Sequence, residues 1–84
     1  MTFDGAVIKE QGVTFGIMVV KPQVLKGSQR DALVRTASGV FGGIPTILMA
    51  QGQRTEYYGR SDLVKFMSSV PISRVPWKRY RSAS

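Results

Sequence analysis

Two short segments of the chain are apolar at consecutive positions, and this pattern restricts the fold more than any other feature of the sequence. The segments are residues 13–20 (Val-Thr-Phe-Gly-Ile-Met-Val-Val) and 46–50 (Thr-Ile-Leu-Met-Ala). Side chains along a strand point alternately to opposite faces, so a sheet with one face in water carries polar residues at every second position. Both segments are instead apolar on both faces. We therefore expect two inner strands that are covered from both sides.

Coverage from both sides leaves two arrangements open. One helix could lie on each face of the sheet, or both helices could share one face while a second copy of the chain covers the other. Parallel pairing of the two strands across the first helix would need a right-handed crossover, and the 25-residue connection between them is long enough for one.

The first helix is predicted over residues 29–41, where apolar residues recur at helical spacing. Ser28 stands at the N-cap position, and Asp31 three residues later completes an S-x-x-D capping box. Gly42-Gly43 follows the last apolar position, where a left-handed C-cap residue is expected.

The second helix is predicted over residues 62–70 by the same periodicity. Ser61 stands at its N-cap, Asp62 suits the positive end of the helix dipole, and Pro71 ends the run. No helical or strand periodicity follows, so residues 71–84 are expected to be irregular.

Further strands flank the two inner ones. Residues 5–11 precede Gly12 and are expected to form either a hairpin with residues 13–20 or a neighbouring strand beside them. Residues 55–58 return from a turn after the second inner strand. The predicted fold is an α+β domain over residues 1–70, ordered ββαββα, with a four-stranded mixed sheet and two helices.

The run Gly43-Ile44-Pro45-Thr46-Ile47-Leu48-Met49, a turn at Gly52, and Tyr57-Tyr58-Gly59 before an apolar helix make residues 28–70 similar to the carboxy-terminal half of the thioredoxin family. In that family a cis-proline precedes a sheet strand, a hairpin follows, and the last helix packs on the sheet. The resemblance implies a sheet scaffold and allows a cis bond at Ile44-Pro45. It does not imply redox activity, because the Cys-x-x-Cys motif is absent and two adjacent strands replace the opening βαβ unit.

The composition argues against most enzyme classes. The 84 residues include no cysteine and no histidine, which removes the thiolate nucleophile, the commonest general base and the commonest ligands of transition metals. The five acidic residues are scattered, without a paired-carboxylate motif or a Ca²⁺ loop. We therefore predict no cofactor, no metal site and no enzymatic activity.

The amino-terminal residues and the apolar runs bear on location. Residues 1–4 lack the basic-then-apolar layout of a secretory signal, and the longest apolar run, residues 15–20, is too short to span a bilayer. We expect a cytoplasmic protein without a membrane span.

The C-terminal segment, residues 71–84, suggests a partner. It has four of the twelve basic residues and no acid, and so contributes +4 of the net charge of +7. Cations neutralise phosphates and aromatic rings stack on bases, which suits a nucleic acid. Alternatively, residues 75–77 dock on the domain and leave solvated charges around them. The candidate binding residues are Arg74, Trp77, Lys78, Arg79, Tyr80 and Arg81.

A second basic and aromatic patch surrounds the second hairpin, at Arg54, Tyr57, Tyr58 and Arg60. The two neighbouring tyrosines must point to opposite faces of the sheet, so only one of them can enter the core from a given side. The other could mark a contact surface.

Two classes of function are consistent with these features. The first is a small non-enzymatic binding module whose basic surface engages a nucleic acid or another acidic partner. The alternative is a structural or protein-interaction subunit, in a homodimer or a larger complex, anchored by the segment around Trp77.

Overall fold

Two parallel strands, β2 (Val13–Val20) and β3 (Thr46–Gln51), form the centre of the sheet. In this computed structural model, which describes residues 2–10 and 12–82, β1 (Thr2–Glu10) pairs antiparallel with β2 and β4 (Thr55–Tyr58) antiparallel with β3. The antiparallel neighbours expected for both inner strands are therefore confirmed, and the two inner strands use the parallel pairing that the length of their connection allows.

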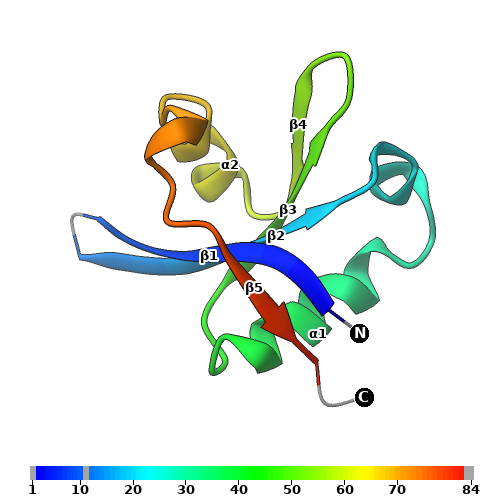
Figure 1. Ribbon diagram of the computed structural model, residues 1–84, viewed down its shortest axis with the longest axis horizontal. Coiled ribbons are helices and arrows are strands. Elements are labelled where there is room, and N and C mark those ends of the chain that lie inside the picture. Colours follow the sequence, from blue (N-terminus) through cyan, green and yellow to red (C-terminus); the bar gives the residue numbers. More distant parts are fainter. Residues whose placement is uncertain (1, 11, 83–84) are drawn as a thin grey trace.

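The sheet has five strands rather than the predicted four. Residues Lys78–Arg81 form β5, which pairs antiparallel with the first residues of β1 and gives the strand order β4-β3-β2-β1-β5. The prediction of an irregular C-terminal segment is wrong here, because an edge strand with one apolar side chain has no alternation to recognise. Figure 1 shows β5 crossing in front of β1 near the two chain termini.

One helix lies on each face of the sheet. The helix α1 (Arg30–Val40) and the short 3₁₀ helix η1 (Pro22–Lys26) pack on one face, which we call the α1 side. The helix α2 (Ser61–Met67) and the 3₁₀ helix η2 (Ile72–Arg74) pack on the other, the α2 side. A single chain thus covers both faces of β2 and β3, and a second copy is not needed for that purpose.

The two-sided burial follows the alternation in the sequence. On the α2 side, Ile17 and Ile47 are fully buried, and on the α1 side Met18 and Leu48 are 3% and 0% exposed. Each side chain of this kind contributes about 1.5–3 kcal/mol when it is removed from water. The two apolar clusters therefore lie back to back across β2 and β3.

The N-cap predictions are wrong for both helices. The N-cap residue of α1 is Gln29, one position after Ser28, and that of α2 is Arg60, one position before Ser61; neither makes a side-chain capping bond. The acids of the two helices bind other side chains: Asp31 accepts a hydrogen bond from the distant Tyr58, and Asp62 pairs with its near neighbour Arg60.

The C-terminal end of α1 agrees with its prediction, whereas that of α2 does not. Gly42 and Gly43 have φ values of 88° and 89° and donate to Gly39 and Ser38, as in a Schellman motif, so the predicted glycine cap is confirmed. The helix α2 ends three residues before the predicted residue 70. The hydroxyls of Ser68 and Ser69 donate to carbonyl oxygens of its last turn, which favours a turn over another helical residue.

The aromatic ring of Phe41, just after α1, lies directly on the sheet. A Cβ atom at Gly16 would overlap this ring, and one at Gly5 would lie 3.1 Å from it and 2.5 Å from the Ile17 carbonyl oxygen. The two glycines pack against Phe41 because they have no side chain. Phe3 contacts the same ring at a centroid distance of 5.9 Å.

The peptide bond between Ile44 and Pro45 is trans, as is every peptide bond among the described residues. The cis bond that the thioredoxin resemblance allows is therefore not formed. Within residues 2–10 and 12–82, neither helix has the length and apolar character that a membrane span requires.

We predict that Gly16→Ala lowers the free energy of unfolding by about 1–3 kcal/mol, because the added methyl group must displace the Phe41 ring. Urea unfolding measures the effect. Gly39→Ala is the matched control: nothing lies within 4 Å of the added carbon, and alanine in a helix is favoured over glycine by about 1 kcal/mol. Equal stability of the two variants would contradict this placement of Phe41.

Candidate anion-binding surface

The strand β5 of the basic C-terminal segment is held at the sheet edge by backbone pairing with β1 and by the side chain of Tyr80. In the register of β5 with β1, Tyr80 lies opposite Phe3 and Arg79 opposite Asp4. The Tyr80 ring stacks on Phe3 at 5.7 Å between centroids and meets the Phe41 ring almost at a right angle at 4.9 Å. Such aromatic pairs add about 0.5–1.5 kcal/mol each beyond the area that they bury. The cluster of Phe3, Phe41 and Tyr80 therefore anchors β5 on the α1 side.

Arg79 and Arg81 project to the opposite side of the sheet, because neighbouring residues in a strand alternate. Thr2 and Asp4 of β1 occupy the matching positions, and all four side chains are exposed. The α2 side of the sheet is thus open to solvent over β5, with two guanidinium groups on it.

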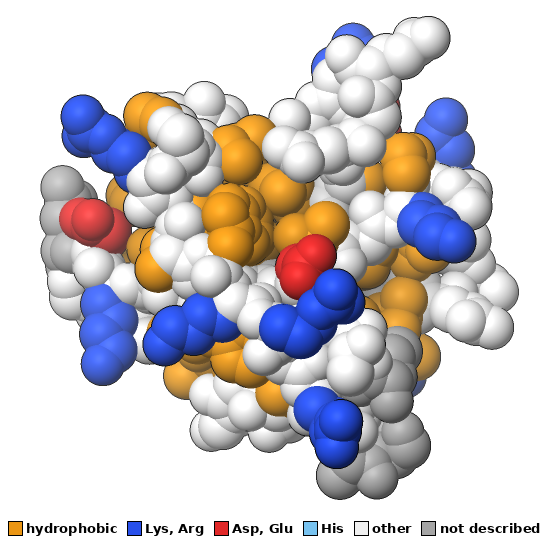
Figure 2. All heavy atoms as spheres, viewed as in Figure 1, with side chains coloured by type: hydrophobic (Ala, Val, Ile, Leu, Met, Phe, Trp, Pro, Cys, Tyr) orange, Lys and Arg blue, Asp and Glu red, His pale blue; other side chains and the backbone are white. Residues whose placement is uncertain are grey.

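Few of the basic side chains near β5 have an acidic partner. Arg79 Nε lies 3.3 Å from Asp4 Oδ1, and the two side chains are 66% and 57% exposed. An exposed pair of this kind contributes at most about 1 kcal/mol, so Arg79 can exchange Asp4 for another anion. Among the described residues, no carboxylate forms an ion pair with Arg74, Lys78 or Arg81. Figure 2 shows basic side chains in a row across the face toward the viewer, with acidic side chains near them.

Trp77 packs inward rather than outward. Its ring is half-buried in the apolar cluster of the α2 side, and its Nε1 donates a hydrogen bond to the Ile72 carbonyl oxygen at 3.2 Å. Val75 is 6% exposed in the same cluster. Residues 75–77 are therefore docked on the domain, which agrees with the alternative given for this segment.

The structure separates the six predicted residues into two groups. Arg74, Lys78, Arg79 and Arg81 are exposed, whereas Trp77 and Tyr80 pack against other side chains of the chain. Since both rings are engaged, the cations rather than the rings are available to a ligand. We call Lys78, Arg79 and Arg81 the β5 cations.

The second predicted patch is divided by the sheet. Tyr57 contacts the apolar cluster of the α2 side, where burial raises its pKa, while Tyr58 contacts that of the α1 side. The two tyrosines thus point to opposite faces, as predicted. The guanidinium of Arg60 forms two hydrogen bonds with Asp62, at 3.0 and 2.7 Å, and these bonds lower the pKa of the carboxyl group. The patch is therefore not one continuous surface.

Tyr58 connects the end of β4 to α1. Its hydroxyl donates to Asp31 Oδ1 at 2.5 Å, and the Arg30 guanidinium carbon lies 4.2 Å from the centre of its ring. The hydrogen bond raises the pKa of Tyr58 above its ordinary value, an effect that Arg30 partly opposes. We assign this contact a role in fixing α1 against the sheet.

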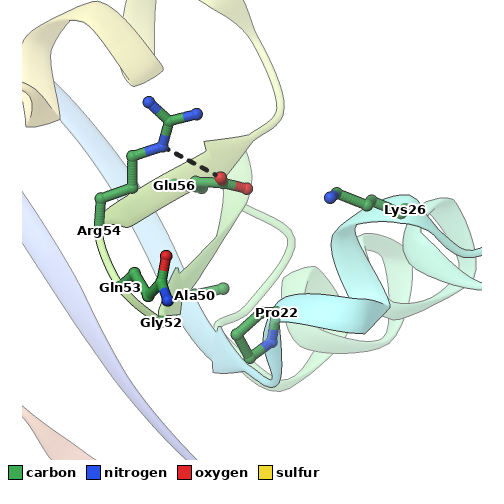
Figure 3. Close-up of a pocket in the computed structure, with 7 residues that line it drawn as sticks. All are labelled: Pro22, Lys26, Ala50, Gly52, Gln53, Arg54 and Glu56. Carbon is green, nitrogen blue, oxygen red and sulfur yellow. Dashed lines mark ion pairs between the residues drawn. The ribbon is translucent and has the colours of Figure 1, made fainter.

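A cleft of about 460 Å³ lies at the carboxyl ends of β2 and β3, between η1 and the β3–β4 hairpin. Figure 3 shows Lys26 reaching toward Glu56 from one side, while Arg54 approaches the same carboxylate from the other. Arg54 Nε lies 3.6 Å from Glu56 Oε1. The carboxylate between the two cations would repel an anion, so the cleft is a weaker anion site than the β5 cations.

Lys26 was not among the predicted site residues. Ligands of open α/β sheets bind beyond the carboxyl ends of parallel strands. The possibility of parallel pairing could therefore have drawn attention to the residues that follow both inner strands. The sequence alone does not bring Lys26 and Arg54 together, because they lie in separate loops.

Two further observations bear on the identity of the site. Within the part of the chain that the structure describes, no three His, Cys, Asp or Glu side chains form a group that could hold a metal ion. The chain matches no protein-family model, no curated protein and no solved structure. The function is therefore inferred from the geometry and charge of the chain.

We predict that Asp31→Asn lowers the pKa of Tyr58 toward its ordinary value, because the substitution removes the carboxylate that accepts the hydrogen bond from the Tyr58 hydroxyl. The stabilisation from this hydrogen bond should be present below the ordinary pKa of tyrosine and be lost as the pH rises through the raised value. NMR titration of the tyrosine ring carbons measures the shift. The control Asp62→Asn should leave the raised pKa of Tyr58 unchanged. An unchanged Tyr58 pKa in Asp31→Asn would show that the hydrogen bond to Asp31 does not raise it.

We predict that the fluorescence of Trp77 is blue-shifted and partly protected from acrylamide in the folded protein, since the indole is half-buried and hydrogen-bonded. The chain in concentrated urea supplies the exposed reference. Equal quenching in the folded and unfolded states would show that residues 75–77 are not docked.

Proposed function

We propose that the protein is a small non-enzymatic binding module that engages the phosphate groups of a nucleic acid through its basic surface, with the β5 cations as the main contact. The observation that carries the proposal is the exposure of Lys78, Arg79 and Arg81 on one edge strand. Among the described residues, Asp4 is the one carboxylate paired with any of them, and its partner is Arg79.

The net charge of the chain supports the same partner. Twelve basic and five acidic residues give +7, so the field of the whole molecule attracts polyanions at long range. The exposed Arg74 lies four positions before Lys78 and adds to the charge at this end of the chain. A strand carrying several cations can follow a phosphate backbone, because the strand is itself extended.

The expected binding mode is phosphate contact without base stacking. Tyr80 stacks on Phe3 and meets Phe41, and Trp77 donates its N–H to the Ile72 carbonyl oxygen, so stacking on a base would require these contacts to break. Phosphate contacts position a protein on a nucleic acid but read no sequence. Binding should therefore depend strongly on salt and weakly on base sequence.

The alternative, a protein-interaction subunit anchored by Trp77, has less support at that residue. The indole that was expected to anchor a partner is instead packed against Val75 and the core of its own chain. A hydrogen-bonded aromatic ring of this kind contributes to the stability of its own domain.

We predict that duplex and single-stranded oligonucleotides bind with an affinity that falls linearly on a log–log plot against salt, with a slope of about −0.9 per phosphate for the duplex. Arg79→Gln/Arg81→Gln should weaken binding for every sequence tested and reduce the slope for the duplex by about two. Fluorescence anisotropy at several salt concentrations measures both quantities.

The matched control is Arg35→Gln/Lys65→Gln, which removes two exposed cations from the helices and changes the net charge equally. A small decrease in affinity is expected from this control. If both double variants weaken binding equally, the β5 cations are not the contact, and if neither oligonucleotide binds, the proposed function is wrong.

A further inference from the structure

The strand β5 covers only the first part of β1. The register between them runs from Thr2 opposite Arg81 to Gly5 opposite Lys78, whereas β1 continues to Glu10 and pairs with β2 to the end. Figure 1 shows the β1–β2 hairpin continuing past the point where the chain from α2 crosses to enter β5. Within residues 2–10 and 12–82, no strand therefore pairs with the outer edge of β1 at residues 6–10.

The chain that runs past this edge does not pair with it. Among the described residues, no backbone hydrogen bond joins residues 6–10 to the segment from α2 to β5. That segment makes its own turns instead, with Arg74 N donating to Pro71 O and Trp77 N donating to Val75 O. An unpaired strand edge is a template for another extended chain.

A groove of about 390 Å³ lies between this edge and the passing segment. Phe66 and Val70, both half-buried, lie beside Ile8 and Val75 in it, and the Phe66 ring is fixed by edge contact with Phe15 at 5.8 Å. On the α2 side the groove thus has apolar side chains beside the polar Ser69 and Arg74, and on the other side it is bordered by the edge of β1. Apolar pockets beside a strand edge are the combination that binds an added strand.

The charges at the groove favour an acidic occupant. Lys9 of β1 and Arg74 of η2 lie on its two walls, and both are exposed without an ion pair among the residues described. Glu10 is the one acid that lines it. Lys9 points to the α1 side and Ile8 to the α2 side, because residues alternate along β1.

We propose that the outer edge of β1 at residues 6–10, together with this groove, binds an extended acidic segment of a partner protein as an added strand in line with β5. Apolar side chains of that segment pack on Phe66 and Val70, and the alternate acidic side chains face Lys9, with Arg74 at the opposite wall. The backbone pairing supplies affinity, and the alternation supplies specificity.

Other occupants fit less well. A second copy of this chain would bring its own charge of +7 and place a second Lys9 near the first, which is unfavourable. A nucleic acid has no amide groups to pair with the strand edge and would leave the apolar part of the groove unfilled. The partner is therefore distinct from the nucleic acid proposed for the β5 cations.

The test uses a short fluorescent peptide in which glutamate and valine alternate, measured against a peptide of the same composition with the glutamates grouped at one end. The alternating peptide should bind more tightly by about tenfold, which corresponds to 1.4 kcal/mol. Its binding should slow hydrogen exchange of amides within residues 6–10, which a contact by charge alone would not do. Absent binding, or equal binding of the two peptides, would overturn the proposal.

Two sets of variants complete the test. Lys9→Glu/Arg74→Glu should weaken the alternating peptide about tenfold or more, while the control Arg35→Glu/Lys65→Glu, with the same net charge, should weaken it less. Two peptides N-methylated at the two possible sets of alternate residues complete the comparison. One should lose binding and the other should keep it, because only one edge of an added strand pairs with β1.

Three outcomes would overturn the proposed peptide site without contradicting nucleic-acid binding by the β5 cations. In the first, N-methylation at either set of alternate peptide residues weakens binding equally. In the second, the protein self-associates and Lys9→Glu abolishes the self-association. In the third, an oligonucleotide slows hydrogen exchange of the amides within residues 6–10. Loss of oligonucleotide binding in Arg79→Gln/Arg81→Gln, with peptide binding retained, would support two distinct sites.

Discussion

The removal of β2 and β3 from water on both sides is the constraint on which the rest of the structure depends. Ile17 and Ile47 face α2 while Met18 and Leu48 face α1, so neither helix could leave without exposing one side of the central pair. An 84-residue chain has little apolar surface to spare, and a core two layers deep uses most of it. The crossover through α1 and the position of α2 on the opposite face together meet this requirement within one chain.

A second contact extends the sheet beyond its apolar centre. Phe41 lies on Gly5 and Gly16, and with Phe3 it forms a surface on which Tyr80 packs. The rest of β5 is cationic, so its place in the sheet rests on this ring and on backbone pairing with β1. The same contact turns Arg79 and Arg81 toward solvent, because alternate residues of a strand face opposite ways. Packing on one side of β5 thus creates the charged surface on the other.

The two proposed binding surfaces share β1 and differ in chemistry. Over residues 2–5 the strand is covered by β5, and the exposed groups are mainly guanidinium and ammonium groups. Over residues 6–10 the strand edge is open, and apolar side chains of α2 and its C-terminal turn border it. A phosphate backbone requires the first kind of surface and an extended peptide the second. Short pairing between β5 and β1 therefore determines where one surface ends and the other begins.

The sequence by itself determined the two inner strands, the glycine cap of α1 and the hairpins, because each depends on alternation or on residues adjacent in the chain. It also indicated the basic residues of the C-terminal segment. Only the tertiary structure decided that this segment forms a fifth strand and that Trp77 and Tyr80 turn inward. It also decided that Asp31 accepts a hydrogen bond from Tyr58 instead of capping its helix. These outcomes depend on contacts between residues far apart in the chain, such as Tyr80 with Phe3 and Phe41, and local periodicity carries no information about them.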